Sequence, residues 1–251
     1  MCNPSVRRTI LTTSTTPPPH HRTTGRAMLE VAVFSAASAL TAIRAGAHRI
    51  ELCASYASGG LTPSLATFLE IIAALGYPVN LPVPIHIMIR PHAHSFVYTP
   101  AELAQMTSSI AAFAAAGASG FVFGALDAGS RVDVAANAAL VRAAGGRPCT
   151  FHRAIESVGD VRAGMEGVVA CGFASVLTGG GEAGVEGVKE VQERFGGRVS
   201  VVLGGGVRRG NVRALREGAG VAWVHSAAIT GEGEEVDGEE VRALVVLVGE
   251  S

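Results

Sequence analysis

The chain has 251 residues, of which 48% are hydrophobic, and its formal net charge is -1. This size can fill one large core, and the near-zero charge excludes the basic surface of a typical nucleic-acid-binding protein. The apolar residues form short runs broken by glycine, proline and charge, so the sequence predicts no membrane span. Four cysteines without C-x-x-C spacing predict neither a disulfide framework nor a zinc knuckle, and they favour a reducing compartment.

The first 28 residues differ from the rest in composition. The stretch Thr12–Thr24 is rich in threonine, proline and histidine, and no acidic residue occurs before Glu30. Such a segment buries too little apolar surface to fold, so we predict a disordered N-terminal tail over residues 1–28. A mitochondrial presequence is the alternative, although three consecutive prolines at 17–19 would break its amphipathic helix. Met28 could also be the true start of the protein.

From residue 29 onward, a short β-branched segment is repeatedly followed by a polar turn and then by a helical segment. The expected strands are Leu29–Ser35, Arg49–Cys53, Ile85–Arg90, Gly120–Phe123, Cys149–His152, Ser175–Thr178, Val199–Leu203 and Ala222–Ser226. The expected helices are Ala36–Ala45, Ser64–Leu75, Pro100–Ala116, Val134–Ala144, Val158–Ala170, Val185–Phe195, Gly210–Glu217 and Glu239–Val248.

Eight strands that alternate with eight helices predict parallel pairing through crossover helices. Either an open doubly wound sheet or a closed barrel satisfies this pattern. The first strand is not followed by the G-x-G-x-x-G fingerprint of a dinucleotide-binding sheet. The sequence therefore predicts one α/β domain over residues 29–251, folded as a (β/α)8 TIM barrel.

The active sites of such barrels lie where the strands end, and side chains alternate in direction along each strand. Glu51 and Cys53 are therefore expected to point into the barrel, because the alternating apolar residues Ile50 and Leu52 should face the helices. The same alternation places Arg90 and His152 inside. Glu51 and Arg90 would lie on adjacent strands, so we predict an ion pair between them.

Further candidate residues follow the later strands. The fourth strand leads to Asp127, and the eighth ends at His225 and Ser226. The glycines 204–206 after the seventh strand predict a turn whose N–H groups bind an anion, as the corresponding turn does in many barrels. Arg153, directly after His152, would add positive charge to the same rim.

The chain contains eight short motifs in order: Glu-Leu-Cys-Ala (51–54), Gly-Gly-Leu-Thr-Pro-Ser (59–64), Ile-Arg-Pro (89–91), Gly-Ala-Leu-Asp (124–127), Thr-Phe-His-Arg-Ala (150–154), Val-Leu-Thr-Gly-Gly (176–180), Gly-Gly-Gly-Val (204–207) and Val-His-Ser (224–226). Together they give the chain a resemblance to the copper homeostasis protein CutC family over residues 29–226. The resemblance implies a TIM barrel, a cytoplasmic location, a homo-oligomer and a role in copper binding or trafficking. It implies that the family pocket contains Glu51, Cys53, Arg90, Asp127, His152, Arg153 and His225.

The chain departs from the family pattern in ways that bear on copper. Many relatives have a cysteine on the first strand, where this chain has Ala32 and Val33, so a pair of thiolates is not intact. Cys53 is then the one cysteine expected at the mouth, and Cu(I) prefers sulfur ligands. His92 and His94 could assist from the loop after the third strand.

Two leading functional hypotheses follow. In the first, the chain binds Cu(I) at Cys53 and acts in copper homeostasis. In the second, it is an enzyme that acts on a small anionic or phosphorylated metabolite, with Glu51 or Asp127 as general base and His152 transferring protons. A non-catalytic scaffold is a third reading, which explains poorly why so many polar residues converge. The expected partners are a metal ion or small anion and other copies of the chain, and neither nucleic acid nor membrane is expected.

Overall fold

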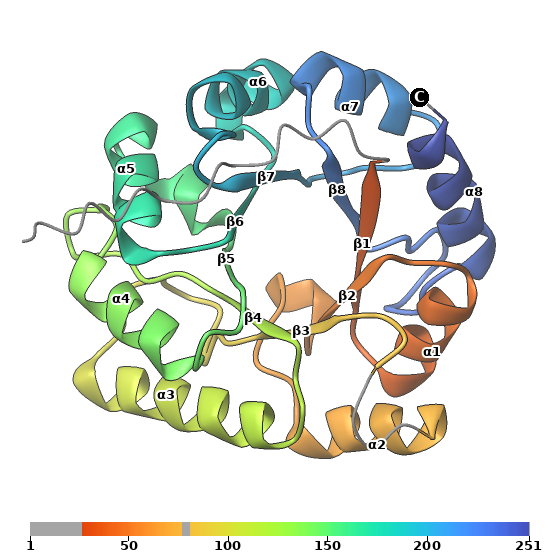
Figure 1. The fold of residues 1–251 in the computed structure, drawn as a ribbon, viewed down its shortest axis with the longest axis horizontal. Coiled ribbons are helices and arrows are strands. Elements are labelled where there is room, and N and C mark those ends of the chain that lie inside the picture. Colours follow the sequence, from red (N-terminus) through yellow and green to blue (C-terminus); the bar gives the residue numbers. More distant parts are fainter. Residues whose placement is uncertain (1–26, 77–80, 251) are drawn as a thin grey trace, which may run out of the picture.

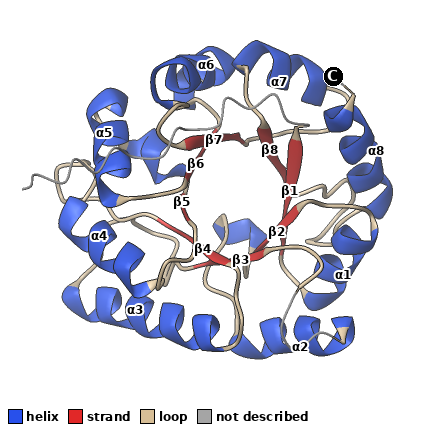
Figure 2. Cartoon of the chain, viewed as in Figure 1, coloured by secondary structure: helices blue, strands red, loops and turns tan. Residues whose placement is uncertain are grey.

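The computed structural model describes residues 27–76 and 81–250. Within them, eight parallel strands close into a barrel in chain order, and the helices form an outer ring (Figure 1). Figure 2 shows the same division between inner strands and outer helices. The predicted (β/α)8 barrel is therefore confirmed. Residues 1–26 of the predicted tail lie outside the described residues, and Met28 already belongs to the first strand.

The elements match the predicted ranges closely. The strands are β1 Met28–Val33, β2 Arg49–Leu52, β3 Ile85–Met88, β4 Gly120–Phe123, β5 Cys149–Phe151, β6 Ser175–Thr178, β7 Ser200–Leu203 and β8 Trp223–Ser226. The helices are α1 Ala36–Arg44, α2 Leu65–Leu75, α3 Pro100–Ala115, α4 Val134–Ala143, α5 Val161–Cys171, α6 Gly184–Phe195, α7 Val212–Ala219 and α8 Gly238–Gly249. Short 3-10 turns that the sequence did not reveal follow β2, β5 and β6: η1 Tyr56–Ser58, η2 Arg153–Ser157 and η3 Gly181–Ala183.

The helix after β5 begins three residues later than predicted because two local signals delay it. The turn η2 occupies the chain immediately after His152, and the Asp160 side chain then accepts a hydrogen bond from the N–H of Ala163. An aspartate in this position satisfies one of the free N–H groups at a helix start. The extra turn holds Arg153 and Glu156 beside the end of β5, at the mouth of the barrel.

Alternation along the strands sorts the side chains into two cores. Ile50 and Leu52 point outward and belong to the large core between the strands and the helices. Cys53, Met88 and Val122 form a separate small cluster inside the barrel. The strand register explains this grouping, since β2 pairs with β3 and β3 with β4 in parallel. The predicted inward direction of the β2 and β3 side chains therefore agrees with the structure.

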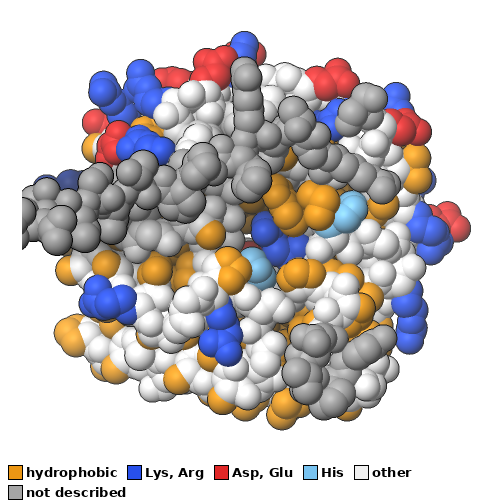
Figure 3. Space-filling model, viewed as in Figure 1, with side chains coloured by type: hydrophobic (Ala, Val, Ile, Leu, Met, Phe, Trp, Pro, Cys, Tyr) orange, Lys and Arg blue, Asp and Glu red, His pale blue; other side chains and the backbone are white. Residues whose placement is uncertain are grey.

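Charge is unevenly distributed over the surface. In Figure 3 the acidic side chains gather on the side formed by α5 to α8 and are sparse over α2 and α3. Leu65 and Leu69 on α2 are exposed there. In the part of the chain that the structure describes, no helix is both long and apolar enough to cross a bilayer.

A carboxylate lies inside the barrel near its middle. Glu30 on β1 is fully buried, and its two oxygens contact the side chains of both neighbouring strands. Arg49 Nε lies 2.5 Å from Oε2, and His225 Nδ1 lies 2.8 Å from Oε1. The Arg49 guanidinium also lies 4.0 Å from the centre of the Trp223 ring. Burial alone would raise the pKa of Glu30, but Arg49 and His225 outweigh it and hold this pKa well below its ordinary value.

We expect Glu30→Gln to destabilise the barrel by about 3–5 kcal/mol, because removing one partner leaves the buried Arg49 without its counter-charge. The free energy of unfolding from urea titrations measures this. The matched control is Glu166→Gln, which breaks an exposed pair with Arg198 and should change the free energy of unfolding much less, because solvent screens exposed pairs. Equal losses in the free energy of unfolding for the two variants would show that the ion pair of Glu30 does not stabilise the barrel more than an exposed pair does.

The same carboxylate predicts a pH dependence of stability. Folding lowers the pKa of this carboxyl group, so the group stabilises the folded protein fully at pH values above its ordinary pKa of 4.5. The stabilisation is lost as the pH falls from 4.5 toward the pKa of the folded state. Wild-type stability should therefore decrease as the pH drops below 4.5. Glu30→Gln should show a shallower decrease over the same range in urea titrations at stepped pH. Parallel curves would assign the acid sensitivity to other carboxylates.

Candidate functional site

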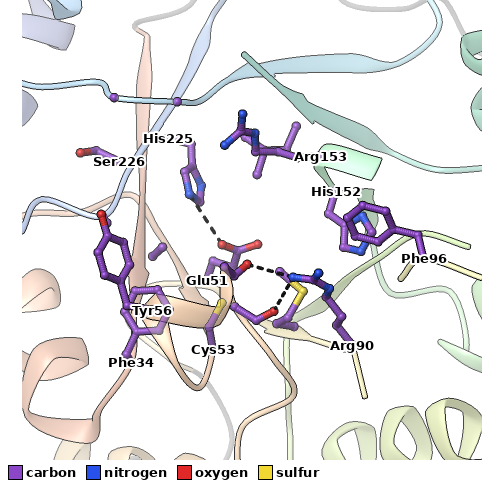
Figure 4. A pocket seen from close by; sticks show the side chains of 18 of the residues that line it. Phe34, Glu51, Cys53, Tyr56, Arg90, Phe96, His152, Arg153, His225 and Ser226 are labelled. Atoms are coloured by element: carbon purple, nitrogen blue, oxygen red, sulfur yellow. Dashed lines mark hydrogen bonds and ion pairs between the residues drawn. The ribbon is translucent and has the colours of Figure 1, made fainter. Parts of the chain in front are cut away.

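A cavity of about 250 Å³ opens at the carboxyl ends of the strands. Most of the residues predicted for the site line it, and Figure 4 shows several of them pointing into one space. The structure also adds residues that the sequence analysis did not assign to the pocket. The predicted lining residues are Glu51, Cys53, Arg90, His152, Arg153, Gly205, Gly206, His225 and Ser226, and the additional ones include Ala32, Phe34, Tyr56, Met88, Phe96, Leu177 and Arg208.

The predicted ion pair between Glu51 and Arg90 is not formed. Arg90 instead donates hydrogen bonds to backbone carbonyls: Nη1 to Ser58, Gly59 and Gly60 at 3.2–3.4 Å, and Nη2 to Ala93 at 2.9 Å. The η1 turn after β2 folds these carbonyls back over the guanidinium, which sequence alternation alone could not reveal. These carbonyl groups bind Nη1 and Nη2 without neutralising the charge, and Nε is buried without a partner among the described residues. The guanidinium forms no ion pair with any described carboxylate.

Glu51 contacts a histidine instead. It is only 3% exposed, and its Oε2 lies 3.7 Å from Nε2 of His225 (Figure 4). Its other oxygen, Oε1, is buried and has no hydrogen-bond partner among the described residues. Burial raises the pKa of Glu51 to about 7, so this group can both hold and release a proton near neutral pH.

His225 lies between two carboxylates. Its Nδ1 bonds to Glu30, which fixes the ring so that Nε2 faces Glu51. Burial by itself would lower the pKa of His225, but the charges of Glu51 and Glu30 raise it above the ordinary value. Glu30 was not predicted as part of the site. Its position was detectable, because it stands on β1 in the same alternation as Ala32, which faces the cavity.

Two sulfur atoms lie on the β2–β3 side of the cavity. Cys53 and Met88 end these neighbouring strands and pack in the same interior cluster. Gly60 passes close to both: a Cβ atom there would lie 3.3 Å from the Cys53 sulfur and 3.6 Å from the Met88 methyl group. Burial, reinforced by Glu51, raises the pKa of the Cys53 thiol well above its ordinary value, so the free thiol is protonated at neutral pH.

The turn after β7 contributes a second guanidinium without a counter-ion. Arg208 donates to the carbonyls of Val207 and Ile229 and to the Ser226 hydroxyl, and it pairs with no carboxylate of the described chain. Gly205 and Gly206 have φ angles of +91° and +71°, which favour glycine, and they line the cavity as predicted. Gly204 packs behind them against Leu177 and is not among the lining residues.

Arg153 and His152 both line the cavity but differ in charge. Arg153 Nη2 lies 2.7 Å from Glu156, which neutralises it. His152 is 4% exposed, its Nδ1 accepts a bond from the N–H of Ala154, and its Nε2 has no partner among the described residues. Burial lowers the pKa of His152 to about 3, so the ring is neutral and its Nε2 carries the hydrogen.

Asp127 lies outside the cavity, which corrects the prediction that it could act as general base. Its carboxylate closes the turn after β4, where it accepts bonds from the N–H groups of Gly129 and Arg131 and pairs with the Arg131 guanidinium at 2.8 Å. These contacts with Arg131 lower the pKa of Asp127. A carboxylate occupied in this way is a turn-forming group and not a free base.

The donor atoms fit copper only in part. In residues 27–76 and 81–250, no group of three or more histidine, cysteine, aspartate or glutamate side chains is arranged to hold a metal ion. His92 and His94 stack at 3.7 Å, and His92 contacts Glu102, but neither histidine lines the cavity. The thiol of Cys53 and the thioether of Met88 remain, and these are soft donors of the kind that Cu(I) prefers.

Comparison with known proteins agrees with the geometry. The model of the CutC family matches residues 27–230. A CutC family protein from Xanthomonas campestris pv. campestris (strain B100) is 40% identical over 204 residues, which cover 80% of this chain and 82% of the relative. The copper homeostasis protein cutC homolog of Caenorhabditis elegans is 37% identical, covering 80% of each chain.

A solved structure from Streptococcus agalactiae, described as a CutC copper homeostasis protein, is 27% identical. It superposes with a TM-score of 0.75 and covers 81% of this chain and 100% of its own. The family match spans every strand of the barrel and the residues that line its mouth. The chain belongs to the CutC family.

Proposed function

We propose that the chain acts in copper homeostasis and carries one Cu(I) ion as cargo at the mouth of its barrel, bound by Cys53 and Met88. The observation that carries this proposal is the pair of sulfur side chains at the ends of β2 and β3, inside one cavity. Thiolate and thioether groups are the ligands that Cu(I) prefers. The names of the relatives point to the same process.

Transfer of a cargo ion needs a site that can also release it. Two sulfur ligands leave the ion open to a third ligand from solution, whereas a closed cage of protein ligands would retain it. Cys53 is buried behind Gly60, so the ion would enter from the cavity and not from the outer surface. The cytoplasmic location and the homo-oligomer expected from the family stay predictions.

We expect Cys53→Ser to lower the affinity of the single Cu(I) site by at least about tenfold, or about 1.4 kcal/mol. Competition titration against a chromophoric Cu(I) chelator in reducing buffer measures stoichiometry and affinity. All variants carry Cys2→Ser so that the N-terminal thiol does not contribute. The matched control is Cys149→Ser, which removes a buried thiol at the start of β5, away from the cavity. Unchanged binding in Cys53→Ser would sink this assignment.

A second candidate function is supported by a different observation. Glu51 and His152 line the same cavity, and the Oε1 and Nε2 atoms of these side chains are buried without hydrogen-bond partners among the described residues. Buried polar atoms without partners destabilise a protein, so this arrangement favours a ligand that forms hydrogen bonds with both atoms. Arg90 and Arg208 supply positive charge beside them. This arrangement favours an enzyme that removes a proton from a small anionic or phosphorylated metabolite, with Glu51 as the base.

Hydrogen exchange tests this second candidate without knowledge of the product. The wild type, incubated in D2O with a panel of small phosphorylated aldoses and ketoses, should exchange one carbon-bound hydrogen of a substrate, seen by proton NMR. Glu51→Gln should slow the exchange by about 10²–10⁴-fold, the usual contribution of a general base. Asp127→Asn is the matched control and should change it little, since Asp127 lies outside the cavity. No exchange with any member of the panel would count against an enzyme of this class.

A further inference from the structure

The charges around the cavity do not cancel. Glu30 pairs with Arg49, Glu51 contacts His225, and Glu156 neutralises Arg153. Arg90 and Arg208 remain, each bound to carbonyl or hydroxyl oxygens and to no described carboxylate. The cavity therefore presents two guanidinium groups without counter-ions. A bare cation approaching it is repelled, whereas an anion is attracted.

This arrangement conflicts with delivery of copper as a free ion, which is positively charged. Cu(I) bound by small thiolates that carry carboxylates is an anionic complex, and guanidinium groups bind carboxylates through paired N–H donors. The sulfur pair and the guanidiniums line one cavity, so a single complex can reach both.

We propose that the chain receives Cu(I) from a small thiol that carries carboxylate groups, and that Arg208, with Arg90, binds these carboxylates while the metal moves to Cys53. This inference rests on the proposed copper function and names the form in which the cargo arrives. The cavity volume of about 250 Å³ is smaller than the roughly 300 Å³ at which pockets for drug-sized ligands begin. The carrier is therefore a compact molecule such as mercaptosuccinate.

The transfer is a ligand exchange without any change in oxidation state. The bond between Cu(I) and the carrier sulfur breaks, and a bond between Cu(I) and the Cys53 sulfur forms. The thiol proton of Cys53 passes to the released carrier thiolate, so atoms and charge balance without another reactant. Met88 supplies the second sulfur and has no proton to lose. Arg208 acts on the carrier alone and makes no bond to the metal.

The experiment compares two Cu(I) donors: the complex with mercaptosuccinate, which is anionic, and the complex with 2-mercaptoethanol, which lacks carboxylates. Transfer to the protein is followed by gel filtration and copper analysis at timed intervals. The wild type should load faster from mercaptosuccinate. Arg208→Gln should slow this loading by about tenfold, within the range that steering by charge supplies, and should leave loading from 2-mercaptoethanol within about twofold.

Arg198→Gln is the matched control, because it also removes one positive charge, from an exposed arginine that pairs with Glu166 outside the cavity. It should change neither rate by more than about twofold. Salt supplies a test on the wild type alone, in case Arg208→Gln does not fold. Raising ionic strength should slow loading from mercaptosuccinate and not from 2-mercaptoethanol, because salt screens only the charged encounter.

The outcomes separate this inference from the copper function itself. Equal loading from both donors, with equal effects of Arg208→Gln and of salt, would overturn the anionic carrier and leave the Cys53 site intact. Failure of the wild type to take Cu(I) from either donor would overturn the proposed copper function and this inference together. Loading that is selective for mercaptosuccinate, lost in Arg208→Gln and retained in Arg198→Gln, supports it.

Discussion

The mouth of the barrel depends on the buried carboxylate of Glu30. A charge in the interior must be paired, and Glu30 is paired on both sides, by Arg49 from β2 and by His225 from β8. Its bond to Nδ1 sets the orientation of the His225 ring and so places Nε2 opposite Glu51. One interaction in the middle of the barrel thereby positions the groups that face the cavity above it.

A second constraint is the competition for Arg90. Four backbone carbonyls from the loops after β2 and β3 accept hydrogen bonds from its Nη1 and Nη2. Glu51 is left with His225 as its only charged neighbour within ion-pair distance among the described residues. The loops are thereby fixed to the strand ends, but neither the guanidinium nor the carboxylate is neutralised by the other. Both remain available to a ligand, which is the usual condition of a binding site.

The sequence predicted the barrel and the inward direction of Glu51, Cys53, Arg90 and His152, because alternation along a strand depends only on local geometry. It mispredicted the partner of Arg90 and the position of Asp127, since both depend on how loops fold after the strands end. Glu30 was missed for a different reason. Alternation along the first strand places it inside the barrel, but the sequence does not show which residues neutralise it there, because His225 lies 195 positions away.

The two candidate functions make different demands on the same cavity. A Cu(I) carrier needs the soft sulfur atoms of Cys53 and Met88, whereas an acid–base enzyme needs the unpartnered oxygen of Glu51. The guanidiniums of Arg90 and Arg208 serve both, because each function then involves an anion. These guanidiniums repel only a free cation that approaches the cavity. The electrostatics of the mouth therefore constrain the charge of the incoming molecule more firmly than they identify its reactive atom, and the choice between sulfur and carboxylate decides the chemistry.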